Sequence, residues 1–161
     1  MSAERLIGRS DCVQALRALL LALPQHEGAS GELQAWSADF ADWPLDEPSV
    51  LEALTQWLRP AGRSLTLLAR DYEAVQRRLP RFAAWRRPWM HRISAWRLAD
   101  DQLPPEPAWL WSRTAGVRWH DNVHWRGLLV QDRAALVQWR EQTDALLQHA
   151  EAGWPVSPLG L

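Results

Sequence analysis

The chain contains no lysine and only one cysteine, and both absences exclude classes of site. Every one of its 18 basic residues is an arginine, so a phosphate-binding loop that ends in Gly-Lys-Ser or Gly-Lys-Thr cannot occur. Neither Gly-x-Gly-x-x-Gly nor the Gly-x-Ser-x-Gly turn of serine hydrolases is present. The lone Cys12 has no partner for an internal disulfide and falls within a predicted helix, which fits a reducing compartment and a buried thiol.

Long hydrophobic runs are also missing. The longest, Ala18 to Leu23, is far shorter than the roughly 20 residues that a membrane-spanning helix needs. The first residues show no basic stretch followed by an apolar core and a small-residue cleavage site, which is the pattern of a secretory signal. We therefore expect a cytoplasmic protein without a membrane span.

What the sequence does contain is an ordinary globular composition with an excess of tryptophan. With 161 residues, 47% of them hydrophobic and 23% charged, the chain has the size of one domain with a substantial core. Its 12 tryptophans are spread from position 36 to position 154, which argues against one shared binding platform. We expect most of them to pack in or beside the core, because each indole buries a large area.

Hydrophobic periodicity and turn residues predict alternating helices and strands over most of the chain. Pro80 falls inside the third helical pattern, so we expect a kink or two short helices there. The predicted helices cover residues 11–23, 48–59, 72–87 and 132–150, and the predicted strands cover 32–40, 64–69, 93–98, 108–114 and 123–130, with a further short strand at 117–120 left open.

This order predicts one α/β domain over residues 1–161, in which residues 153–161 form a Pro-rich surface tail. The strand-helix-strand-helix-strand spacing implies parallel strands joined by right-handed crossovers. The later strands follow one another without helices, so part of the sheet is expected to be antiparallel. The sequence therefore predicts a mixed, mostly parallel sheet flanked by helices.

Positive charge is concentrated in residues 63–97, which hold nine arginines against two acidic residues in a chain of net charge −1. Arginine presents a planar fork of donors suited to phosphate or carboxylate, and the interleaved tryptophans could stack on bases. The alternative is that these arginines pair with acidic residues elsewhere in the chain. The candidates for binding an anion are Arg70, Arg81, Arg86, Arg87, His91 and Arg97.

Motifs for metal binding and catalysis are weak by comparison. His120 and His124 are four residues apart, but their context predicts strand and turn, and no second carboxylate or cysteine cluster completes a ligand set. Cys12 has no neighbouring base in the sequence that would activate it. We therefore expect no metal site, no cofactor and no catalytic residue.

Residues 64–97 resemble a bacterial family whose chains are similar to one half of the phospholipase-D-like fold. The segment has a strand ending in Leu-Leu-Ala-Arg-Asp at Asp71, a helix containing Leu79-Pro80-Arg81-Phe82, and a strand ending at Arg97. The element order of most of the chain fits the same outline. The resemblance implies an α/β/α half-domain. Active enzymes of that fold carry His-x-Lys followed four residues later by Asp, where the His attacks phosphorus and the Lys holds the phosphate oxygens.

In this chain the nearest match is His124-Trp125-Arg126, where arginine replaces the lysine of the motif, Gln131 stands at the Asp position and Asp132 comes one residue late. The resemblance thus implies a degenerate motif. Our leading hypothesis is a pseudoenzyme that binds an anionic ligand, either phosphate or nucleic acid, or a protein partner. Two alternatives stay open, namely a phosphodiesterase that uses His124 and Arg126 across a homodimer, and a structural or regulatory interaction protein.

Overall fold

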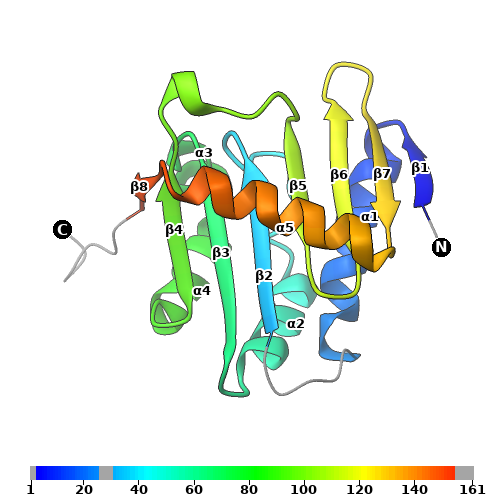
Figure 1. Ribbon diagram of the computed structural model, residues 1–161. Coiled ribbons are helices and arrows are strands. Elements are labelled where there is room, and N and C mark those ends of the chain that lie inside the picture. The colour runs from blue at the N-terminus through cyan, green and yellow to red at the C-terminus, as the bar shows by residue number, and fades with distance from the viewer. Residues whose placement is uncertain (1–2, 26–30, 155–161) are drawn as a thin grey trace.

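An eight-stranded sheet organises the protein. The structure, a computed structural model, describes residues 3–25 and 31–154. The strands lie in the order β1-β7-β6-β5-β2-β3-β4-β8 (Figure 1). Their bounds are β1 Ala3–Ile7, β2 Gly31–Ser37, β3 Arg63–Ala69, β4 Ile93–Arg97, β5 Ala108–Trp111, β6 Gly116–Asp121, β7 Arg126–Val130 and β8 Glu151–Ala152.

Only one part of this sheet is parallel. β2 pairs with β3 and β3 pairs with β4 in parallel, whereas the other five pairings of the described strands are antiparallel. The predicted mixed α/β sheet is confirmed, but the expectation that it is mostly parallel is wrong. β5, β6 and β7 follow one another through short turns, which make neighbouring strands antiparallel, and β1 and β8 each add an antiparallel edge.

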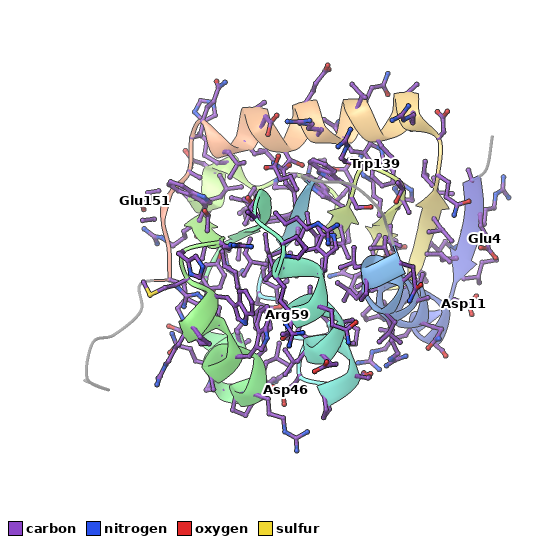
Figure 2. The ribbon with its side chains drawn as sticks, turned by 90° about the horizontal axis from the view of Figure 1, so that it is seen from below. Glu4, Asp11, Asp46, Arg59, Trp139 and Glu151 are labelled. Atoms are coloured by element: carbon purple, nitrogen blue, oxygen red, sulfur yellow. The ribbon has the colours of Figure 1, made fainter. Side chains whose placement is uncertain are left out.

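Helices cover both faces of the sheet, so the protein has three layers (Figure 2). Helices α1 to α4 lie on one face, and α5 crosses the other face from β7 towards β4 (Figure 1). None of the described helices is long and apolar enough to span a bilayer. The bounds are α1 Arg9–Ala22, α2 Pro48–Leu58, α3 Glu73–Arg78, α4 Pro80–Arg86 and α5 Arg133–Leu147, with short 3-10 helices η1 Leu23–Gln25, η2 Arg87–Trp89 and η3 Asp100–Gln102.

Side chains alternate along the central strands between two buried cores. In β3, Leu67 packs in the core beneath α1 to α4, whereas Leu68 packs in the core beneath α5. In β5, Leu110 faces the first of these cores, and Trp109 and Trp111 face the second. A strand buried on both faces carries a near-continuous apolar run, which is why β3 and β5 are detectable in the sequence.

A cluster of polar groups holds α5 on the sheet. Thr143 of α5 is fully buried, and its Oγ1 accepts hydrogen bonds from the indole Nε1 atoms of Trp109 (3.0 Å) and Trp111 (3.3 Å). The buried guanidinium of Arg118 in β6 lies between Trp109 and Trp139, 4.7 and 4.5 Å from their ring centroids. Figure 2 shows Trp139 in the layer between α5 and the sheet. The indole donors of β5 are thus satisfied by α5.

The tryptophans pack as the sequence predicts, since all 12 of them are buried or half-buried. Trp154 departs from the predicted surface tail, because it is only 7% exposed and stacks on Tyr72 with ring centroids 5.2 Å apart. The remainder of the predicted tail, residues 155–161, lies outside the described residues. One aromatic residue therefore anchors the chain where the sequence suggests only a surface segment.

The predicted break at Pro80 is confirmed. Leu79 has non-helical backbone angles and separates α3 from α4, which begins at Pro80. Proline suits the first turn of a helix, where its missing N–H is not needed. Asp46, in the loop before α2, caps α4 because its Oδ1 accepts hydrogen bonds from the backbone nitrogens of Arg81 (2.7 Å) and Phe82 (3.0 Å). Figure 2 shows Asp46 in the helix layer opposite α5.

Candidate functional site

The six basic residues chosen from the sequence do not converge on one pocket. Three of them are occupied by contacts within the chain. Arg70 Nε lies 3.2 Å from Asp71 Oδ2, and Arg97 pairs with Glu151 of β8. Arg86 is buried in the core. Arg70 and Arg97 thus already have a carboxylate beside them, and Arg86 does not reach the surface as an anion site would require.

Arg86 is held by Trp154. Only 6% of Arg86 is exposed, and its guanidinium carbon lies 3.8 Å from the centroid of the Trp154 ring. It also donates a hydrogen bond to the backbone oxygen of Trp154. Desolvation lowers the pKa of Arg86, but a guanidinium remains a cation at neutral pH. The charge of Arg86 is therefore used to fix the C-terminal segment against the core.

The other three candidates lie on the surface. Arg81 is in α4, Arg87 is in η2, and His91 precedes β4, where its ring stacks near Trp89 with centroids 6.3 Å apart. All three are exposed. Neither Arg81 nor Arg87 forms an ion pair with any residue in the described part of the chain.

Two arginines outside the predicted set share this surface. Arg77 and Arg78 end α3, are exposed, and have no ion-pair partner within residues 3–25 and 31–154. The core side of α3 and α4 is formed by Val75, Leu79, Phe82 and Arg86. Arg77 in α3 and Arg81 in α4 are exposed, so each points away from these buried residues. We call Arg77, Arg78, Arg81 and Arg87 the arginine face.

The four side chains of the arginine face are all positively charged, and no acidic residue in the described part of the chain forms an ion pair with them. Arg77 and Arg81 stand four residues apart in the sequence but belong to separate helices, because Leu79 breaks the helix between them. Asp46 is committed to the backbone N–H groups that start α4. Glu73 makes no ion pair with these arginines. The signal in the sequence that could have identified these residues is the density of arginine between positions 77 and 87.

A cleft of about 400 Å³ opens at the carboxyl end of β2, beside the amino end of the antiparallel strand β5. The loops after β2 and before β5 and the turn between β6 and β7 form its walls. β2 lies between β3 on one side and β5 on the other, so the strand order changes direction at β2. Open α/β sheets tend to bind ligands beside such a change of direction, at the carboxyl ends of strands. Its lining includes the indoles of Trp36, Trp43, Trp119 and Trp125 and the carboxylates of Asp39, Asp42, Glu106 and Asp121.

Backbone irregularities gather around this carboxyl-edge cleft. Phe40 and Trp125 are the non-glycine residues of the described chain with positive φ, at 59° and 52°. The register of β6 against β7 shifts between Trp119 and Asp121, so His120 sits at a bulge. Such strain and bulges are concentrated at functional sites in proteins. The six basic candidates from the sequence are not among the residues that line the cleft.

The carboxylates make this cleft a poor host for phosphate. Asp42 is paired with Arg9 at 3.1 Å, and the Arg9 guanidinium lies 5.5 Å from the centroid of Trp125. Glu106 lies 3.4 Å from Arg118. Asp39 has no ion pair within the described residues. A cleft lined by one sign of charge concentrates ligands of the opposite sign, so an anion is repelled here.

The predicted degenerate motif lies at the rim of the same cleft. His124 is exposed in the turn between β6 and β7, and its Nδ1 donates a hydrogen bond to Asp121 Oδ2 at 2.8 Å. Arg126 is exposed at the start of β7. Asp132, the displaced acidic residue of the motif, instead caps α5, where its Oδ2 accepts a hydrogen bond from Ala135 N at 3.2 Å. The length of β7 separates Asp132 from His124.

The structure holds no arrangement that suggests metal chemistry in the part of the chain it describes. No group of three or more His, Cys, Asp or Glu side chains there is placed to hold a metal ion. Cys12 is fully buried in α1, and burial raises the pKa of its thiol. The thiol is therefore kept protonated and away from solvent.

The contact between His124 and Asp121 predicts a specific titration. Hydrogen bonds from the His124 side chain, and then from the backbone of His124 and Val123, lower the pKa of Asp121 from 3.8 to about 2. Because the folded-state pKa is the lower one, this contact stabilises the protein above the unfolded value and is lost as the pH falls through about 2. We expect His124→Ala to raise the pKa of Asp121, as measured by carbon-13 NMR of its carboxyl group.

Asn122→Ala is the control for this titration, since Asn122 lies in the same turn but donates none of the hydrogen bonds that set the pKa of Asp121. In the Asn122→Ala variant, the pKa of Asp121 should be the same as in the unaltered protein. An Asp121 pKa that is the same in His124→Ala would mean that the imidazole contributes nothing and the backbone alone shapes the turn.

Comparison with known proteins shows similarity in structure only. No family model matches the sequence, and no curated protein matches it. TrmBL2, an archaeal chromatin protein whose structure shows a novel mode of DNA binding, matches with a TM-score of 0.65 and 12% identity over 94% of this chain and 54% of its own. This chain thus spans about half the length of TrmBL2.

Two further solved structures match nearly from end to end. NucT from Helicobacter pylori has a TM-score of 0.56 and 8% identity, covering 95% of this chain and 99% of its own. Nuc from Salmonella typhimurium, a phospholipase D family member, has a TM-score of 0.55 and 10% identity, covering 93% and 96%. The chain therefore has the phospholipase-D-like α/β fold, as its sequence predicts. At this level of identity, the likeness establishes the fold alone.

Proposed function

We propose that this protein is a non-catalytic domain that binds the phosphate backbone of a nucleic acid on its arginine face. The observation that carries the proposal is the exposure of four arginines in the consecutive elements α3, α4 and η2 without an ion-pair partner among the described residues, namely Arg77, Arg78, Arg81 and Arg87. Guanidinium groups match the geometry of phosphate oxygens, and their binding to a polyanion releases condensed counterions.

The surroundings of the arginine face favour a nucleic acid over a free phosphate ion. Trp89 is half-buried and Met90 is 52% exposed beside Arg87, so apolar surface for a base adjoins the charges. Aromatic surfaces beside basic grooves bind single strands with little sequence preference, because every base has a face that can stack. One structural neighbour, TrmBL2, is described as binding DNA, which supports the same class of partner.

Catalysis at the carboxyl-edge cleft has less support. A phosphodiester brought to His124 would approach Asp121 at 2.8 Å from the imidazole, with Asp39 and Asp42 lining the same cleft. No lysine exists in the chain to hold phosphate oxygens. None of the arginines of the arginine face lines this cleft, so binding on that face avoids this repulsion.

The test compares the unaltered protein with the triple variant Arg77→Gln, Arg78→Gln, Arg81→Gln. Fluorescence anisotropy with a labelled single-stranded and a labelled double-stranded DNA, measured across a salt series, gives the affinity and its salt dependence. If each arginine contacts one phosphate, the slope of log K against log salt on the duplex should become shallower by about 3 units. Affinity at low salt should fall by about tenfold or more.

The matched control removes the same number of charges elsewhere. Arg5→Gln, Arg126→Gln, Arg133→Gln alters three exposed arginines of β1, β7 and α5. Its salt slope should stay close to that of the unaltered protein. Equal loss in both triple variants would mean that net charge alone drives association. No binding at low salt by the unaltered protein would remove the nucleic-acid proposal and leave a protein partner as the better hypothesis.

A further inference from the structure

A second concave surface lies on the face of the sheet that α5 covers, opposite the face covered by α1 to α4. It is formed between α5 and the turn that joins β5 to β6. It has a volume of about 390 Å³, within the range of small-molecule sites. Its apolar lining comes from Trp111, Leu136 and Val137. Trp111 and Leu136 are buried, but Val137 is 55% exposed, which is unusual for a large hydrophobic side chain in this protein. We call this surface the α5 groove.

Three guanidinium groups surround the apolar lining of the α5 groove. Arg133 and Arg140 come from α5 and Arg113 from the β5–β6 turn. Arg133 is four residues before Val137 and Arg140 is three residues after it, so all three side chains leave the same side of the helix. Among the described residues, the lining thus combines one exposed apolar side chain with three cations and includes no carboxylate.

Two of the guanidinium groups of the α5 groove, those of Arg133 and Arg140, are incompletely satisfied. Arg140 lies 3.7 Å from Glu32 and 3.8 Å from Asp144, whereas charge-assisted hydrogen bonds between such groups measure about 2.7–2.9 Å. Arg133 forms no ion pair with a residue in the described ranges. A carboxylate, phosphate or sulfonate entering the groove could therefore receive better hydrogen bonds from these arginines than Glu32 and Asp144 do.

We propose that the α5 groove binds an amphiphilic anion, a small molecule with one anionic head and an apolar body. The arginines would hold the head, and the body would lie on Val137 above Trp111 and Leu136. An inorganic ion would leave the apolar lining exposed to water, and a neutral hydrophobe would make no ionic contact with Arg133 or Arg140. This site is separate from the arginine face and goes beyond the proposed function. The α5 groove could therefore bind its ligand even if the protein does not bind nucleic acid.

The experiment uses two fluorescent probes of similar shape that differ in charge. The anion 8-anilinonaphthalene-1-sulfonate carries a sulfonate head, and N-phenyl-1-naphthylamine lacks it. Titrated into the full-length folded protein, the anion should bind at least tenfold more tightly than the neutral probe. In the double variant Arg133→Gln, Arg140→Gln, this preference should shrink at least fivefold. Arg126→Gln, an exposed arginine of β7, should leave it unchanged.

Val137→Asp supplies the second arm, because it places a carboxylate at the centre of the groove on an exposed helical position where folding should tolerate it. Binding of both probes should fall at least fivefold. Competition by decanoate and by decyl phosphate then distinguishes a carboxylate from a phosphate as the preferred head. The proposal would be overturned if both groove variants bound the anionic probe as tightly as the unaltered protein does. It would also be overturned if Arg126→Gln reduced the preference for the anionic probe as much as the double variant does.

Discussion

Replacing Arg118 by alanine is expected to lower the free energy of unfolding by about 3–4 kcal/mol. The Arg118 guanidinium lies between two indoles, 4.7 Å from the centroid of Trp109 and 4.5 Å from that of Trp139. It also donates to Gln142 Oε1 at 2.6 Å. Alanine removes two cation–π contacts from a site that is 7% exposed, opens a gap between the rings and leaves the Gln142 oxygen without its donor.

Chemical denaturation measures this loss, and two variants calibrate it. Arg118→Met keeps an apolar chain between the indoles, so its loss should be clearly smaller than that of alanine. Arg126→Ala removes an exposed arginine and should stay within about 0.5 kcal/mol of the unaltered protein. If Arg118→Ala were as mild as Arg126→Ala, the stacked guanidinium would not be what joins α5 to β6.

Replacing Arg86 by alanine is expected to cost about 2–4 kcal/mol of unfolding free energy. Arg86 is 6% exposed, lies 3.8 Å from the Trp154 ring centroid and donates to the Trp154 carbonyl. Without it, Trp154 keeps its stacking on Tyr72 but loses the cation–π contact and the hydrogen bond from Arg86. The edge formed by β4 and β8 should then open more readily, because only Gly153 separates β8 from Trp154.

The adjacent residue provides a control of the same chemical type. Arg87 is exposed and has no ion pair in the described part of the chain, so Arg87→Ala should change stability by no more than about 0.5 kcal/mol. Thermal or denaturant unfolding measures both variants, and hydrogen exchange at β4 localises the effect. The opposite pattern, a stable Arg86→Ala with weakened DNA binding, would restore Arg86 as the anion contact that the sequence predicts.

Secondary structure could be predicted from the sequence where local signals are strong. The break at Pro80 follows from the chemistry of one residue, and the apolar runs of β3 and β5 follow from burial on both faces. β1 and β8 were missed because their side chains are mostly exposed and β8 has two residues. Edge strands of this kind are defined by the partner strand, which the local sequence does not specify.

The site is less predictable than the fold. Counting charges located the basic segment, but the carboxyl-edge cleft gathers Asp39, Glu106 and Asp121 from loops far apart in the sequence. The α5 groove likewise joins Arg113 to Arg133 and Arg140 across the face of the sheet. No short motif marks either surface, because each one is formed by the packing of separate elements.

The sequence alone determined an α/β protein with one arginine-rich segment and an indole-rich core, because periodicity, proline and composition act locally. Only the tertiary structure decided which arginines are available to a partner. Arg86 and Arg87 are neighbours with the same side chain, yet the first is packed against Trp154 and the second faces solvent. The 100° rotation between successive helical residues, and the position of Trp154 at the far end of the chain, make that difference.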